Sequence, residues 1–129
     1  MVVDASVIIE VLLRTPDSDA IADRLLTSRE RLHAPHLLDL EVAQVLRRYV
    51  ARGALTDLRG REALEVLAVF PLTRYAHEPL LARIWQLRDR LTAYDAAYVA
   101  LAEALGATLV TRDQQLARAT GTRARVELA

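Results

Sequence analysis

The stretch that decides the fold is the opening segment MVVDASVIIEVLLR, residues 1–14. Its first part, Met1 to Ala5, is a short apolar run that predicts a buried strand. Its second part, Ser6 to Arg14, predicts an apolar helix that follows the strand at once. A strand that leads directly into a helix is typical of a strand–helix–strand unit, so this opening favours a parallel sheet.

The same alternation continues to the end of the chain. We expect helices over 15–28, 38–52, 57–68, 78–90 and 92–105, a short helix from 113, and strands over 31–34, 69–72, 108–111 and 125–128. Thr15 and Pro16 are predicted to start the second helix, with Thr15 as its N-cap. Short strands separated by helices predict one α/β domain over residues 1–129, in which a parallel sheet is flanked by helices on both faces.

Composition narrows the chemistry that this chain can carry out. Its 129 residues include 17 acidic side chains and 17 basic ones, all of them arginine, and no cysteine. The absence of cysteine excludes thiol nucleophiles and disulfides, and the absence of lysine excludes Schiff-base chemistry and a phosphate-loop lysine. Because net charge is zero, any contact with nucleic acid must come from a local patch. Asp4 interrupts an opening apolar run that is too short to span a bilayer, so we expect a cytoplasmic protein without membrane contact.

Four acidic residues are expected at one edge of the sheet. Asp4 follows the first strand, and Asp113 follows the strand that ends at Thr111. Glu41 and Asp95 lie in the first turns of two helices. The carboxyl ends of parallel strands and the amino ends of the helices meet at the same edge, where such folds bind ligands. Each acid alone has an ordinary explanation as a helix cap or a dipole partner, but the fold brings all four to one rim.

Clustered carboxylates need a cationic partner, and the chain has no lysine to supply one. A hard divalent cation, Mg²⁺ or Mn²⁺, prefers oxygen ligands and can activate water for attack on a phosphodiester. His33, His36 and His77 show no metal-ligand spacing and are interpreted as surface or cap residues. A phosphoaspartate receiver would need a lysine. A glycosidase pair stays possible in principle, although nothing in the sequence indicates a sugar cleft.

Four stretches in this order resemble the PIN-domain ribonucleases, and closely the VapC toxins of bacterial toxin–antitoxin pairs. The stretches are Val3–Ser6, Pro35–Leu46, Leu91–Ala102 and Leu109–Asp113, and the similarity covers essentially the whole chain. The resemblance implies a metal-dependent endoribonuclease that uses Mg²⁺ or Mn²⁺ and cleaves RNA, with single-stranded loops such as those of tRNA as the expected target.

The resemblance also assigns residues. It implies that Asp4, Glu41, Asp95 and Asp113 are the catalytic and metal-binding acids, supported by the hydroxyls of Ser6 and Thr111. Ordinary turn capping is the alternative for both hydroxyls. Asp39 lies two residues before Glu41 and is interpreted as the N-cap of its helix.

Further residues are assigned by their place along the chain. Arg74 and Arg112 follow predicted strands, so we expect them to contact RNA phosphates near the acidic rim. Ile84 and Trp85 form a helical apolar stripe with Leu81 and Leu87, which predicts core packing. The segment Val7–Leu13 carries more apolar surface than one helix face needs, so part of it is expected to form a groove for a partner.

The family resemblance also implies binding partners. It implies a small VapB-like antitoxin peptide in the groove, and it also implies a homodimer, which no single residue indicates. Two alternatives stay open at this point: a PIN-like nuclease of RNA processing without a toxin role, and an inactive PIN fold that serves as a binding module. The presence of all four acids disfavours the inactive module.

Overall fold

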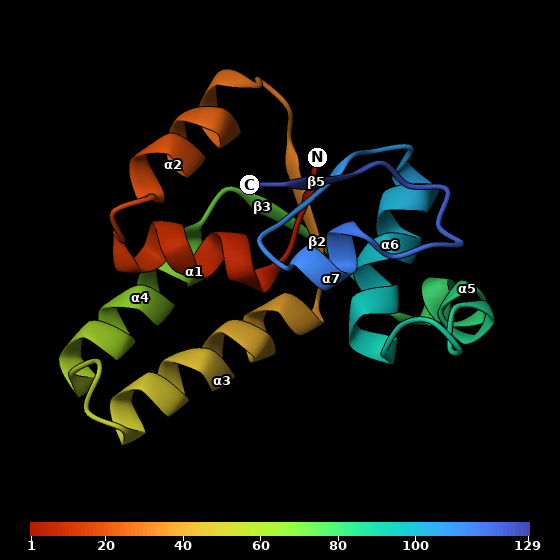
Figure 1. Cartoon of the computed structure of the whole chain (residues 1–129). Coiled ribbons are helices and arrows are strands. Elements are labelled where there is room, and N and C mark those ends of the chain that lie inside the picture. The colour runs from red at the N-terminus through yellow and green to blue at the C-terminus, as the bar shows by residue number, and fades with distance from the viewer.

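The computed structural model describes all 129 residues and contains one five-stranded parallel sheet (Figure 1). The strand order is β3-β2-β1-β4-β5. The strands are β1 (Val2–Val3), β2 (Leu32–Pro35), β3 (Leu72–Tyr75), β4 (Leu109–Thr111) and β5 (Val126–Leu128). The helices are α1 (Ala5–Leu13), α2 (Ser18–Thr27), α3 (Leu37–Ala51), α4 (Asp57–Val69), the 3₁₀ turn η1 (Glu78–Leu80), α5 (Leu81–Gln86), α6 (Ala93–Leu105) and α7 (Gln114–Ala117). The predicted α/β fold is confirmed.

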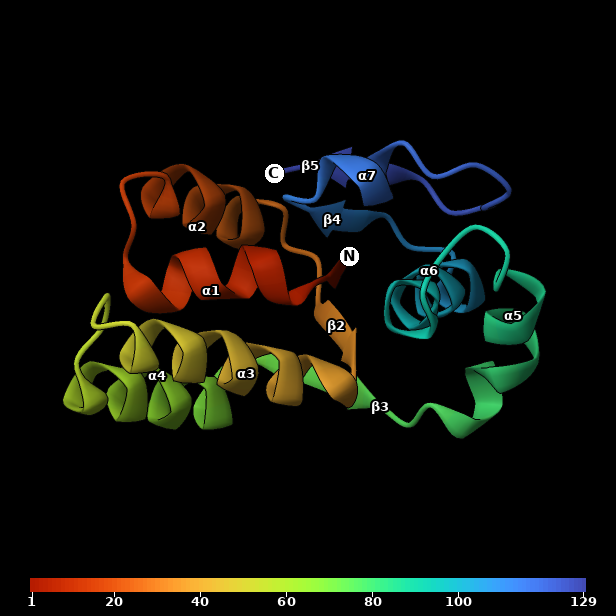
Figure 2. The same cartoon turned by 60° about the horizontal axis from the view of Figure 1, so that its bottom comes forward.

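The chain reverses its direction across the sheet beside β1. From β1 it moves outward to β2 and β3 through α1 to α4, and it then returns to β4, on the other side of β1, through α5 and α6. Figure 2 shows the consequence: α1 to α4 lie on one side of the central strands, and α5 and α6 lie on the other. The ends of β1 and β4 therefore form a switch point, which is where open parallel sheets bind their ligands.

Small side chains let α6 pack closely against the sheet. Seven consecutive residues, Ala96 to Ala102, are buried, which is the pattern of a helix covered on all sides. The helix contacts β1, β2 and β4 on its inner side, and α5 covers its outer side. Asp95, at the amino end of this helix, is thereby held at the edge of the sheet. None of the helices combines the length and the apolar character needed to cross a membrane.

Two predicted element boundaries are wrong for local reasons. The predicted strand at 69–72 is instead β3 at Leu72–Tyr75, because α4 continues through Val69 before the chain turns at Pro71. The predicted helix at 78–90 is broken into η1, the short α5 and a set of turns up to Arg90.

Two side-chain assignments are also corrected. Thr15 is not the N-cap of the second helix: that position belongs to Asp17, and Thr15 uses its carbonyl to accept the Ser18 N–H at 2.9 Å. Trp85 is not part of the core: its indole is 68% exposed and lies under the guanidinium of Arg88, whereas Leu87, two residues further on, is buried.

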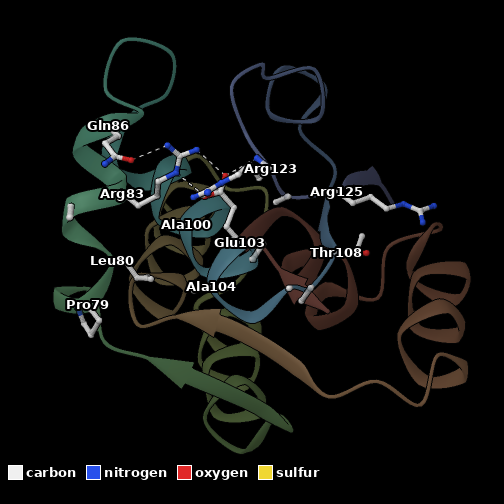
Figure 3. Close-up of a pocket in the computed structure, with 15 residues that line it drawn as sticks. Pro79, Leu80, Arg83, Gln86, Ala100, Glu103, Ala104, Thr108, Arg123 and Arg125 are labelled. Atoms are coloured by element: carbon white, nitrogen blue, oxygen red, sulfur yellow. Dashed lines mark hydrogen bonds and ion pairs between the residues drawn. The ribbon is translucent and has the colours of Figure 1, made fainter.

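Glu103 connects α6 to the segment that leads into β5, away from the acidic rim. Its carboxylate accepts two hydrogen bonds from Arg83 of α5, at 2.7 and 3.0 Å, and one from the Arg123 backbone N–H at 2.7 Å (Figure 3). Arg83 also donates to the Gly121 carbonyl at 3.0 Å. The Arg83 hydrogen bond holds the pKa of Glu103 down at about 2. This ion pair therefore stabilises the fold.

We expect Glu103→Gln to lower the free energy of unfolding at pH 7 by about 2 kcal/mol, the order of a charged hydrogen bond. The pKa of Glu103 is depressed in the folded state, so its stabilisation is complete above the ordinary value of 4.5 and is lost as pH falls towards 2. Urea unfolding at pH 7, 4 and 2.5 should show that the free energies of unfolding of wild type and Glu103→Gln become more similar as the pH falls. Glu62→Gln, which removes an exposed ion pair with Arg59, is the control. Stability curves that stay equally far apart at every pH would contradict this assignment.

Candidate active site

Asp4 is a buried carboxylate at the end of β1, with only 6% of its surface exposed. It is the N-cap of α1, and its Oδ1 accepts hydrogen bonds from the Ser6 hydroxyl at 2.5 Å and the Val7 backbone N–H at 3.2 Å. Its Oδ2 accepts a hydrogen bond from the Thr111 hydroxyl at the end of β4. Both oxygens are therefore fixed in orientation by groups from two neighbouring strand ends.

The Ser6 and Thr111 hydroxyls also hold the loop after β4. Ser6 Oγ accepts the backbone N–H of Arg112, and Thr111 Oγ1 accepts the backbone N–H of Asp113, each at 2.9 Å. Each hydroxyl therefore donates to Asp4 while accepting from the loop that carries Asp113. The structure places both residues beside Asp4, as their predicted supporting role requires.

Glu41 reaches the same rim from the amino-terminal half of α3. Its Oε2 accepts a hydrogen bond at 2.8 Å from the hydroxyl of Tyr98, which belongs to α6 and is only 1% exposed. Sequence reasoning did not single out Tyr98. Its spacing of three residues from Asp95 places both on one side of α6, and this was the signal available to find it.

Asp95 and Asp113 each lie at the amino end of a helix, α6 and α7 respectively. Asp95 lies in the first turn of α6, whose N-cap is Thr92, and the Thr92 hydroxyl accepts the Asp95 backbone N–H at 3.2 Å. The Asp113 side chain caps α7 by accepting the backbone N–H groups of Gln115 at 2.7 Å and Leu116 at 3.3 Å. Both acids thus lie at helix amino ends, where the dipole favours negative charge.

The electrostatic environment shows that the four acids act on one another. Burial raises the pKa of Asp4, and the Ser6 and Thr111 hydrogen bonds oppose that shift. Burial also raises the pKa of Glu41, and the charges of Asp4 and Asp95 raise it further. Burial followed by the charge of Asp113 raises the pKa of Asp95. The four predicted acids are therefore connected by three repulsive pairs: Glu41 with Asp4, Glu41 with Asp95, and Asp95 with Asp113.

No three Asp, Glu or His side chains of the chain converge into a ready-made metal cage. Both oxygens of Asp4 accept hydrogen bonds from protein donors, Ser6 and Val7 on one side and Thr111 on the other. The donor chemistry still suits a hard cation, because all four groups offer oxygen and repel one another when no cation is present. Mg²⁺ keeps several waters and uses only one or two carboxylates together with substrate phosphate, so it does not require a cage.

The remaining predicted residues fall into two groups. Arg112 lies beside the acids, where its guanidinium pairs with Asp17 at 3.0 Å and Glu10 at 3.7 Å. Arg74 lies within β3, not after a strand, and it donates to Asp39 at 2.7 Å and to the Leu67 carbonyl at 2.8 Å. Asp39 is consequently a partner of Arg74 and not the N-cap of α3, a position that His36 occupies.

The histidines take part in packing contacts and not in a metal site. His33 Nδ1 hydrogen bonds to the Tyr75 hydroxyl at 2.9 Å, and His77 Nε2 accepts the Leu37 backbone N–H at 2.9 Å. Both contacts tie β2 and α3 to β3 and to the segment after it. The histidines therefore support the frame of the rim rather than its chemistry.

Two cavities lie on different parts of the molecule. One of about 730 Å³ opens between α1 and α3 and includes Ser6, Glu41 and Arg112 in its walls. The other, of about 820 Å³, surrounds the Glu103–Arg83 ion pair near the start of β4 and contains none of the four acids (Figure 3). The first cavity is therefore the one that includes a predicted catalytic acid, Glu41, in its walls.

The chain thus forms a parallel α/β domain with acidic side chains at the switch point of its sheet. A sequence model of the PIN domain matches residues 1–121, and the chain belongs to the PIN-domain family. Ribonuclease VapC9 of Mycobacterium tuberculosis is 48% identical over 116 residues, which cover 90% of this chain and 87% of that protein. PIN-domain ribonucleases generally use divalent metal ions.

Solved structures share this architecture. VapC20 of Mycobacterium tuberculosis, described as a toxin that cleaves the sarcin–ricin loop, has a TM-score of 0.70 at 15% identity and covers 94% of this chain and 95% of its own. VapBC from Salmonella typhimurium, solved bound to DNA, has a TM-score of 0.66 at 20% identity, with coverage of 98% and 96%. At these identities the likeness concerns the fold.

Removing one charge from the rim should stabilise the metal-free protein. The raised pKa of Asp95 means that its surroundings, in sum, disfavour its ionised form. We expect Asp95→Asn to be more stable than wild type in chelator at pH 7.5 by about 1 kcal/mol, the usual order for relief of like-charge contacts. Thermal melts measure this, and adding Mn²⁺ should stabilise wild type more than the variant.

Asp89→Asn is the control, because Asp89 is exposed and has no ion pair or side-chain hydrogen bond. Its melting temperature should equal that of wild type both in chelator and in Mn²⁺. If Asp95→Asn melts below wild type in chelator and Mn²⁺ stabilises both proteins equally, Asp95 supports only the start of α6.

Proposed function

We propose that this protein is an endoribonuclease and the toxin of a VapBC-type toxin–antitoxin pair. The main support is the set of four acids at the ends of β1 and β4 and the starts of α3 and α6, Asp4, Glu41, Asp95 and Asp113, where neighbouring carboxylates raise the pKa of Glu41 and of Asp95. The proposal is also supported by 48% identity, over 90% of the chain, to a protein named ribonuclease VapC9. In contrast, the chain has no cysteine or lysine for a covalent mechanism.

In this proposal Asp4, Asp95, Asp113 and Glu41 hold Mg²⁺ or Mn²⁺, directly or through water. When bound, such an ion activates a water and stabilises the charge that develops on a phosphodiester. Ser6 and Thr111 keep the Asp4 carboxylate oriented, which preserves its position before the ion and substrate arrive. These two hydroxyls are positioning residues.

Glu41 is the side chain suited to moving a proton. Its Oε2 is occupied by the Tyr98 hydroxyl, and its Oε1 accepts no hydrogen bond within the chain. Burial and the charges of Asp4 and Asp95 raise the pKa of Glu41, so its carboxylate is a stronger base than an ordinary glutamate. Glu41 Oε1 is therefore placed to accept a proton from the attacking water, while Tyr98 fixes the carboxylate.

The substrate in this proposal is a single-stranded loop of a structured RNA such as tRNA. Bases in a loop are unstacked and can be splayed onto a protein surface, whereas the bases of an RNA duplex lie in a groove that side chains do not read. Arg112 is the predicted phosphate contact nearest the acids. Arg74 is less suited to this role because Asp39 and the carbonyls of Leu67 and Leu72 already use its donors.

The antitoxin is assigned to a groove between α1 and α4. Most of the apolar excess of Val7–Leu13 is buried under neighbouring helices, but Val11 and Leu12 line this groove together with Val66 and Val69. Val66 is 49% exposed and Val69 is 81% exposed, so α4 offers apolar side chains to a small VapB-like peptide. The homodimer stays a prediction from the family resemblance.

Replacing the acids should separate cleavage from folding. We expect Asp4→Asn and Asp95→Asn each to reduce RNA cleavage by at least about a hundredfold, because an amide is a neutral and weaker ligand for a hard cation. Single-turnover cleavage of a labelled tRNA in Mn²⁺ measures this, with circular dichroism to confirm the fold. Asp89→Asn is the control and should cleave as wild type does. Full activity of a purified Asp95→Asn protein would rule out this site.

A further inference from the structure

The cavity between α1 and α3 continues the acidic rim into a groove along α3. It begins at Ser6, Glu41 and Tyr94 and extends past Val45 to Arg48 and Arg52. Glu41, Val45, Arg48 and Arg52 follow the i, i+4, i+7 and i+11 spacing of one helix face. At 1.5 Å per residue, Arg48 lies about 10 Å and Arg52 about 16 Å along the helix axis from Glu41. The groove therefore leads away from the site for about three helical turns.

Its outer end carries unpaired positive charge. Arg48 and Arg52 are exposed, and neither guanidinium has a carboxylate partner, although Arg52 lies over the Tyr49 ring at 4.7 Å. Arg112, at the inner end, differs because it is paired with Asp17 and Glu10. In a chain of zero net charge, two free guanidiniums on one wall of a groove form the kind of local patch that binds successive phosphates.

An exposed aromatic ring lies at the inner end of the same groove. Tyr94 directly precedes Asp95, is 65% exposed, and forms no side-chain hydrogen bond. Leu40 of α3, which is 75% exposed, lines the groove with it. Exposed aromatic side chains beside a basic groove are the usual platform for unpaired bases, since every base has a face that can stack.

We propose that this groove binds the single-stranded RNA segment next to the cleaved phosphate, with a base stacked on Tyr94 and the following phosphates on Arg48 and Arg52. This inference rests on the proposed ribonuclease function and adds residues that contact the substrate outside the acidic rim. A single strand fits these features better than a duplex, whose bases are already stacked and would leave Tyr94 without a partner.

The test is binding of a fluorescently labelled ten-nucleotide oligouridine, measured by anisotropy over a range of salt concentrations. All variants are made in an Asp95→Asn background so that the RNA stays intact. The Arg48→Ala/Arg52→Ala variant should bind about tenfold more weakly and lower the slope of log K against log salt by about 1.4, the value for two phosphate contacts on a single strand. Tyr94→Ala should also lose about tenfold, at an unchanged slope, and Tyr94→Phe should restore binding.

Matched controls remove the same groups elsewhere. Arg31→Ala/Arg47→Ala makes the same change of charge at two exposed arginines that have no ion pair and do not line the groove. Trp85→Ala removes an exposed ring on α5. Both should bind oligouridine as the background protein does.

The outcomes separate this inference from the function on which it rests. If wild type cleaves RNA but the groove variants bind as the controls do, the groove is not the RNA path, although the ribonuclease proposal stands. Unchanged RNA binding together with weakened binding of a VapB-like peptide would assign the groove to the antitoxin and overturn the inference. If wild type neither cleaves nor binds any RNA, the proposed function itself fails.

Discussion

The rest of the structure depends on one buried carboxylate, Asp4, at the switch point of the sheet. A buried charge is costly unless hydrogen bonds compensate it, and here two hydroxyls and a backbone N–H do so. Those donors come from α1 and from the end of β4, so the hydrogen bonds of Asp4 also connect the end of β1 to the end of β4. The loop that carries Asp113 is fixed by the same hydroxyls. The geometry of the rim follows from this single requirement.

The carboxylates near Asp4 repel one another, and this repulsion contributes nothing to the stability of the fold. Burial and neighbouring charges raise the pKa of both Glu41 and Asp95, which makes these acids a cost to stability in the absence of a cation. By contrast, Glu103 is paired with Arg83, which lowers the pKa of Glu103 and stabilises the fold. An arrangement that is costly in one place and satisfied in others indicates selection for function at the costly place.

The sequence predicted those features that depend on local patterns. The strand–helix alternation was sufficient for the parallel fold. The position of each acid after a strand or near a helix start was sufficient to predict the edge of the sheet at which it lies, while a shared metal site stays a prediction. Some errors were local, as at the end of α4, and others involve contacts between distant segments. The pairing of Arg74 with Asp39 spans 35 residues, and that of Tyr98 with Glu41, which was missed, spans 57. Trp85 has an apolar spacing, but periodicity did not show that its side of α5 would be exposed.

The proposed function requires the carboxylates at the ends of β1 and β4 to share one binding site for a divalent cation. Anomalous diffraction from crystals soaked in Mn²⁺ tests this requirement, because manganese is located without any assumption about activity. We expect a strong anomalous peak within coordination distance of at least two of the four acids, Asp4, Glu41, Asp95 and Asp113. A map with no peak at this rim, at a Mn²⁺ concentration that supports RNA cleavage, would contradict it.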